Sequence, residues 1–142
     1  MSTEKPTRRK TANSPLLSTE NMPGKLPPQA VDMEEAVLGA LMLDKNAVAE
    51  VIDILRPEAF YKEAHSKIFA AIQQLFHTTQ PVDILTVTQQ LRKNGDLELI
   101  GGPYFITQLT NRVASAANIE FHARIVLQKY IQRELIRISG ET

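Results

Sequence analysis

The sequence of 142 residues contains no cysteine, so a disulfide framework and thiolate metal sites are both excluded. It has no apolar run near the roughly 18 residues needed to span a bilayer, and its N-terminus lacks the apolar core of a signal peptide. A cytoplasmic protein is therefore the simplest interpretation. The length and the hydrophobic content of 43% suit one soluble domain with a packed core.

Catalytic and cofactor-binding patterns are also missing. The phosphate-binding motif GxxxxGK[ST] and the zinc motif HExxH do not occur. The histidines form no i,i+3 or i,i+4 pair that would suggest a metal site: His65, His77 and His122. Three carboxylates fall in the first turn of an expected helix, where the helix dipole is a sufficient explanation for them: Asp32, Glu34 and Glu35. We therefore predict no catalytic, cofactor-binding or metal-binding residues.

Charge is balanced overall but unevenly distributed. Residues 1–29 hold five basic and two acidic side chains, a net charge of +3, so the remainder of the neutral chain carries −3. Duplex binding relies on clustered Lys and Arg, and a mildly acidic body is poorly suited to it. The basic tail is either a solubilising segment or a weak nucleic-acid contact, and its charge alone does not decide between them.

Proline marks the N-terminal segment. Five of the eight prolines lie within the first 28 residues, which contain little apolar material to bury. We expect residues 1–28 to form a disordered basic arm.

Helical periodicity follows the arm, and no alternating strand pattern competes with it. The spacing of apolar residues predicts helices over about 29–43, 46–55, 62–77, 84–94, 103–112 and 118–139. Asp83 suits the N-cap of the fourth of these helices, and Asn94-Gly95 suits its end. The predicted fold class is all-α.

The last predicted helix carries two apolar faces. At about 100° per residue, the first face contains Ile119, Ala123, Val126, Leu127 and Tyr130. The second face contains Phe121, Ile125 and Ile136. Either the helix lies between its own domain and a partner, or other helices of the same domain cover both faces. The polar ending "SGET" is what we would expect of a domain taken from a longer protein.

The stretch "NGDLELIGGPYF" holds the glycine pair Gly101-Gly102 ahead of an expected helix. Such a pair can cradle a phosphate or let the chain turn. Pro103 removes a backbone donor that an anion nest would use, and no lysine follows. The pair is therefore predicted to be a turn with positive φ.

Four segments, taken in order, resemble a known family: "PPQAVDMEEAVLGALMLD", "FYKEAHSKIFAAIQQL", "PVDILTVTQQLRKNGDLELIGGPYFITQL" and "SAANIEFHARIVLQKYIQREL". Together they are similar to the N-terminal domain of bacterial replicative DNA helicases of the DnaB type, from about Leu26 to Ile138. Each motif is short, but the ordered set is specific.

The resemblance implies one domain over residues 29–142. It would consist of a compact helical head (29–100) and a helical hairpin leading to a linker (101–142), with Gly101 and Gly102 as the hinge. In this family hairpins pair between subunits, and three pairs form a collar on a hexameric ring that unwinds DNA at replication forks. The collar also binds the helicase-binding domain of primase, and a helicase loader is a further candidate partner. ATP and Mg²⁺ belong to a following ATPase domain that this sequence lacks, so the resemblance implies an enzyme only for the whole helicase.

Helical position selects candidate residues for self-association: Tyr104, Ile106, Phe121 and Ile125. For each of them an ordinary core position is the alternative. Two other function classes stay open at this point. One is a small regulator that binds nucleic acid directly, and the other is an enzyme in its own right.

Overall fold

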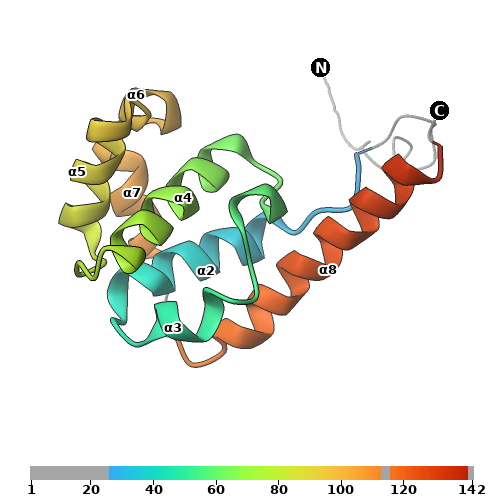
Figure 1. Ribbon diagram of the computed structural model, residues 1–142, viewed down its shortest axis with the longest axis horizontal. Helices are drawn as coiled ribbons and strands as arrows, with labels where there is room; N and C mark the ends of the chain where they lie inside the picture. Colours follow the sequence, from blue (N-terminus) through green and yellow to red (C-terminus); the bar gives the residue numbers. More distant parts are fainter. Residues whose placement is uncertain (1–25, 113–115, 141–142) are drawn as a thin grey trace, which may run out of the picture.

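A computed structural model describes residues 26–112 and 116–140, and within these ranges the protein is helical without strands (Figure 1). The elements are α2 (Val31–Leu43), α3 (Ala47–Val51), the 3₁₀ helix η2 (Pro57–Ala59), α4 (Glu63–His77), α5 (Ile84–Asn94), α6 (Leu97–Ile100), α7 (Gly102–Asn111) and α8 (Ile119–Ile138). The all-α prediction is confirmed. The predicted disorder of residues 1–25 concerns a segment outside the described residues.

Helix α2 is the centre of the fold. It packs against α4, α7 and α8, so apolar residues are buried on several of its sides. Val37, Leu38 and Leu41 are fully buried, and the small residues Gly39 and Ala40 are also enclosed. Small side chains allow neighbouring helix backbones to approach closely. The continuous apolar run of α2 is therefore explained by contacts on more than one face.

Helix α5 begins and ends as predicted. The Asp83 carboxylate accepts a 2.9 Å hydrogen bond from the Thr86 backbone N–H, while the Asp83 N–H donates to the Thr86 hydroxyl at 3.0 Å. This reciprocal pair satisfies two donors that the start of a helix leaves free. Gly95, with φ of 81°, closes the helix in the left-handed conformation.

Two elements differ from the sequence prediction. The second helix was expected to reach residue 55, but α3 ends at Val51 and the chain continues in a turn. Leaving the helix here lets Leu55, Ala59 and Phe60 enter the core. The one-turn helix α6 was not predicted, and its buried Leu97 and Ile100 contact α4, α5 and α7 through this turn.

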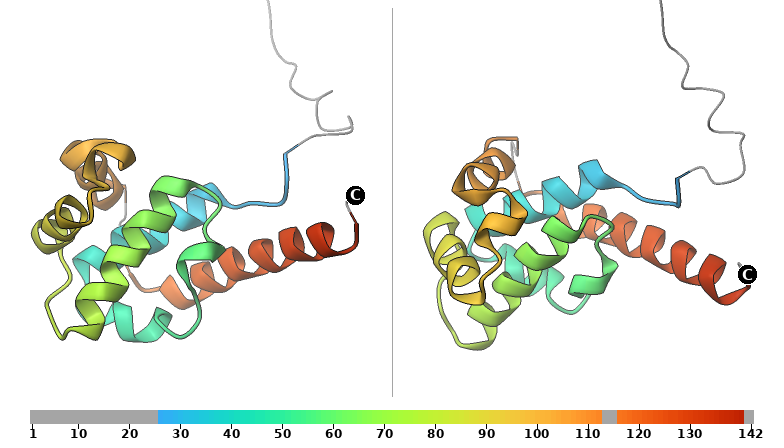
Figure 2. Two further views of the ribbon diagram at one scale, coloured as in Figure 1. Left: turned by 45° about the horizontal axis from the view of Figure 1, so that its top comes forward. Right: turned by 90° about the horizontal axis from the view of Figure 1, so that it is seen from above.

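The last two helices occupy different places on α2. Helix α7 packs on α2, α5 and α6, whereas α8 packs on α2, α3 and η2. The predicted hairpin thus consists of two consecutive helices that are each supported by α2, rather than two helices lying side by side. The far half of α8 extends beyond the other helices, and the segment before α2 runs alongside it (Figure 2).

Candidate protein–protein interface

The first face of α8 belongs to the domain itself. Ile119, Ala123 and Val126 are buried, and Leu127 and Tyr130 pack partly against the same core. These are the residues that the helical spacing predicted. Because this face packs on α2 and α3, the opposite side of α8 is the one that is exposed.

The second face of α8 is open in the single chain. Phe121 is 64% exposed and Ile136 is 51% exposed, while Ile125 is half-buried. Within the described ranges, the other helices therefore cover the first face and leave Phe121 and Ile136 of the second face exposed. An aromatic ring and a long aliphatic side chain held at a helix surface are typical of a contact surface for another protein.

A further set of apolar side chains on α8 was missed in the sequence. Ile131, Leu135 and Ile138 are 48%, 60% and 68% exposed. Their spacing of four and three residues places them on one face, between the first and second faces. The same spacing was visible in the sequence and could have identified them.

The two candidates on α7 have opposite surroundings. Tyr104 is 71% exposed, and its hydroxyl accepts a hydrogen bond of 3.2 Å from the Gln108 amide. Ile106 is fully buried within the core. The domain therefore occupies Ile106 itself, and we withdraw this residue from the self-association set. The physical reason is that α7 turns Ile106 and Leu109, three residues apart, toward the core.

The predicted hinge glycines have positive φ angles, 111° for Gly101 and 79° for Gly102. Gly101 ends α6 and also precedes α7, so one residue redirects the chain between two helices. A Cβ atom at Gly101 would lie 3.3 Å from Cβ of Phe105, whereas one at Gly102 would meet nothing within 4 Å. The turn conformation is confirmed, and a hinge motion remains a prediction.

Arg133 ties α8 to two distant segments. Its guanidinium donates hydrogen bonds of 2.9 Å to the carbonyl of Pro28 and 2.9 Å to the carbonyl of Ala59. The same group lies over the rings of Tyr61 and Tyr130, 5.4 Å and 5.9 Å from their centroids. A planar cation with five donors suits two carbonyls and two rings at once. Nothing in the helical spacing distinguished Arg133 from the other arginines of α8.

The contacts of Arg133, which we call the Arg133 clamp, hold residues 26–28 beside α8. We had expected these residues to belong to the arm. Together with α8 they enclose a mainly apolar groove of about 550 Å³, which we call the terminal groove. Its lining consists of Leu26, Pro27, Pro28, Lys129, Gln132 and Ile136. The groove thus includes Ile136 of the second face.

Charged side chains near both ends of α8 are paired along the helix. Arg124 contacts Glu120 at 3.1 Å, and Arg137 contacts Glu134 at 2.8 Å. The hydrogen bond from Arg137 lowers the pKa of the Glu134 carboxyl. Such exposed pairs add little to stability.

One carboxylate of the first helix has a different role from the one expected. Glu34 is buried, and it accepts hydrogen bonds from the Tyr61 N–H at 2.6 Å and from His65 Nδ1 at 2.7 Å. It therefore joins α2 to the segment just before α4 and to the first turn of α4. The His65 ring stacks on Phe105 at 6.0 Å and is fully buried. A pair enclosed in this way has no access to a substrate.

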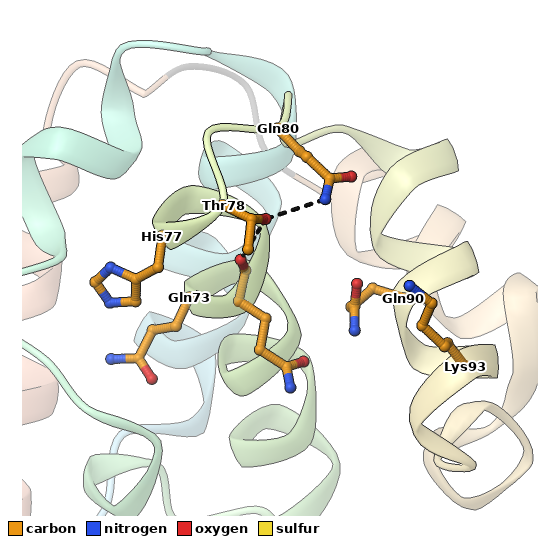
Figure 3. A pocket seen from close by; sticks show the side chains of 7 residues that line it. Gln73, His77, Thr78, Gln80, Gln90 and Lys93 are labelled. Atoms are coloured by element: carbon orange, nitrogen blue, oxygen red, sulfur yellow. Dashed lines mark hydrogen bonds between the residues drawn. The ribbon is translucent and has the colours of Figure 1, made fainter.

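A polar depression of about 440 Å³ lies between the end of α4 and α5 (Figure 3). It is lined by Gln73, Gln74, His77, Thr78, Gln80, Gln90 and Lys93. The Gln80 amide donates a 3.0 Å hydrogen bond to the Thr78 hydroxyl, and the amides of Gln74 and Gln90 each bond to Asn94. The lining contains no carboxylate beside a nucleophile, so it resembles no hydrolytic site. Among the described residues, no three His, Cys, Asp or Glu side chains gather as metal ligands.

None of the helices in the described ranges has the length and apolar character required to cross a membrane.

Residues 26–128 match the model of a protein family described as the DnaB-like helicase N terminal domain. The replicative DNA helicase DnaB of Rhodothermus marinus is 50% identical over 110 residues, which cover 78% of this chain and 12% of that protein. The replicative DNA helicase DnaB of Geobacillus stearothermophilus is 45% identical over 115 residues, covering 81% and 25%. The chain therefore spans a quarter or less of these two relatives.

Solved structures agree with the family match. The N-terminal domain of DnaB helicase from Mycobacterium tuberculosis superposes with a TM-score of 0.78 at 38% identity, covering 80% of this chain and 81% of that one. A second structure is described as a DnaB-like replicative helicase and its interactions with primase. It has a TM-score of 0.69 at 28% identity and covers 78% of this chain and 26% of that one.

Proposed function

The chain belongs to the family of DnaB-like helicase N-terminal domains, and from this premise we propose that it is the oligomerisation and primase-docking domain of a hexameric replicative helicase. In this role it acts by protein–protein contacts. The collar of the assembled ring would consist of three dimers of this domain.

The observation that carries the self-association role is the open second face of α8. Phe121 and Ile136 remain more than half exposed after the domain has formed its own core. Large apolar side chains at this level of exposure are stabilised when a partner removes them from water, by roughly 25 cal/mol per Å² of apolar area. Tyr104 on α7 adds a second exposed aromatic residue with a polar tip, a residue type favoured at interfaces.

The primase-docking role is supported by one related structure. That protein is described together with its interactions with primase, and it shares the fold of this chain. We propose the helicase-binding domain of primase as the partner, and a helicase loader as a further one.

ATP binding, Mg²⁺ binding and strand separation are proposed for the whole helicase and assigned to the part of it that this chain does not include. DNA would then contact the assembled ring rather than this domain directly. As a component of a bacterial replication machine, the protein would act in the cytoplasm.

Light scattering coupled to gel filtration tests the self-association role. We expect dimers or larger species at high micromolar concentration, with Phe121→Glu raising the dissociation constant at least tenfold, or about 1.4 kcal/mol. Leu85→Glu is a matched control, because Leu85 is 65% exposed on α5 and outside α8. A strictly monomeric chain, unaffected by either change, would remove this role.

Primase docking needs a separate measurement. Calorimetric titration of the chain with the C-terminal domain of primase from the same organism should give saturable binding. If the domains do not bind while the chain still self-associates, docking must be assigned to another part of the helicase.

A further inference from the structure

The terminal groove lies where the segment before α2 meets the far half of α8 (Figure 2). One wall is formed by residues 26–28, and the other by Lys129, Gln132 and Ile136. Leu26 is 69% exposed and Ile136 is 51% exposed, so no side chain of the described ranges covers the groove. Apolar surface left in contact with water favours any segment that can cover it.

The chain itself supplies an apolar segment next to this groove. Residues 1–25 join the groove wall at Leu26, and apart from Met1 and Met22 their large apolar side chains are the adjacent pair Leu16 and Leu17. Leu17 lies nine positions before Leu26, a reach of at most about 30 Å. The lining of the groove along α8 extends over about 10 Å. Pro23-Gly24 is a dipeptide typical of turns, so the leucine pair can return to the groove.

The charges near the groove are complementary to those of this segment. Lys129 is the charged side chain of the lining, and the described residues offer it no ion-pair partner. Within residues 11–24 the single charged side chain is Glu20. It lies between Leu17 and the groove wall, so a chain that returns the leucines to the groove brings Glu20 toward Lys129. An exposed pair of this kind adds little energy but favours one orientation.

We infer that Leu16 and Leu17 of the same chain occupy the terminal groove and cover Ile136. Covalent attachment gives the pair a local concentration of roughly millimolar, which favours it over a free partner of the same chemistry. Any partner that uses Ile136 on the second face must then displace the arm. Arg133 is a positioning residue for this contact, because its hydrogen bond to the Pro28 carbonyl holds the groove wall on α8. The docking does not depend on the proposed self-association, and only the competition with a partner does.

The docked arm is close to balance with the free arm. Two leucines gain from leaving water, but ordering residues 18–25 costs conformational entropy. The two forms are then present in comparable amounts, and the arm contributes little to the free energy of unfolding. A partner's apparent dissociation constant rises in proportion to the chains whose groove is closed, by about threefold if about one third of the grooves are open.

Tryptophan fluorescence at submicromolar concentration tests the occupancy, because the chain has no tryptophan of its own. Leu17→Trp should emit at shorter wavelength than Thr7→Trp, which places the probe elsewhere in the arm. Adding Ile136→Glu should shift the emission of Leu17→Trp toward that of Thr7→Trp. Adding Leu85→Glu instead, at similar exposure on α5, should leave it unchanged. An emission of Leu17→Trp that does not respond to Ile136→Glu would overturn the inference.

Cysteine cross-linking distinguishes the arm of the same chain from a second copy, because the chain has no cysteine. The variant Ser18→Cys, Gln132→Cys keeps both leucines and Ile136, and mild oxidation should give a cross-linked monomer. The same pair combined with Leu16→Glu and Leu17→Glu measures random encounters of the tethered arm. Its cross-linking should be at least fivefold slower. A cross-linked dimer in place of the monomer would assign the groove to a second copy and overturn the inference.

Light scattering on the chain with Leu16→Glu and Leu17→Glu measures the competition. If the second face self-associates, this chain should have a dimer dissociation constant about threefold lower than the unaltered chain. A strict monomer that still forms the cross-linked monomer would contradict the proposed function and support the docking. Self-association that is unchanged by the two substitutions, together with equal cross-linking rates with and without them, would overturn the inference while the proposed function stands.

Discussion

The guanidinium of Arg133 donates a 2.9 Å hydrogen bond to the backbone carbonyl of Pro28, which lies 105 residues earlier in the chain. A second bond of 2.9 Å reaches the carbonyl of Ala59. The last helix α8, the segment before α2 and the 3₁₀ helix η2 are thereby joined by one side chain. The part of α8 that extends beyond the head depends on this clamp for its position.

Replacing Arg133 by Gln should destabilise the domain by about 1–3 kcal/mol, because hydrogen bonds from a charged group and two ring contacts are lost. Thermal unfolding followed by circular dichroism measures this. Arg92→Gln provides the control, since Arg92 is exposed on α5. Arg133→Lys should recover only part of the loss, because an ammonium group cannot address both carbonyls with a planar fork. Equal melting temperatures for Arg133→Gln and Arg92→Gln would show that the clamp has no energetic role.

Two N-terminal deletions should distinguish the contribution of residues 1–25 to stability from that of the Arg133 clamp. Removing residues 1–25 should leave the melting temperature unchanged, because the residues that follow already form a packed apolar core. Removing residues 1–28 also deletes the Pro28 carbonyl and should lower the melting temperature, because Arg133 loses one of its hydrogen bonds. If the shorter deletion already reduced helicity, the arm would be part of the folded core.

Glu34→Ala should be among the most damaging single changes. It leaves the Tyr61 N–H and the buried His65 without their hydrogen-bond partner, and each buried polar group left unpaired costs about 1–3 kcal/mol. Urea unfolding measures the difference. Glu35→Ala is the matched control from the same helical turn, because its ion-pair partner Arg112, at 2.7 Å, is exposed and pairs in contact with solvent contribute about 1 kcal/mol or less. Similar losses for the two variants would contradict the burial argument.

Valine at Gly101 should cost more than valine at Gly102. Both positions have positive φ, which alone costs about 1 kcal/mol or more for a side chain with a Cβ. At Gly101 the new atom would also press on Phe105 at 3.3 Å. Gly95→Val is the control, because Gly95 has a φ of 81° and open space around it. Unfolding curves should rank Gly101 first, and an unchanged melting temperature at Gly101 would exclude strain at this joint.

Several features of the fold were predictable from local chemistry. The capping box at Asp83, the helix end at Gly95 and the turn at Gly101-Gly102 each depend on residues close in the sequence. The buried face of α8 also followed from its spacing. The end of α3 and the position of Ile106 were not predictable in this way, because the surroundings that bury Leu55 and Ile106 come from distant helices.

For the candidate interface too, some features were predictable from the sequence and others were not. Helical periodicity alone located Phe121, Ile125 and Ile136 on one side of α8, because the angle between residues of a helix is set by its backbone. Whether that side is open depends on where α2 and α3 lie, and the terminal groove depends on Arg133 reaching Pro28 across the fold. The sequence by itself determined most of the helices and the two faces of α8. Only the tertiary structure decided which face remains exposed, because exposure is a property of all the neighbours of a residue and not of its own segment.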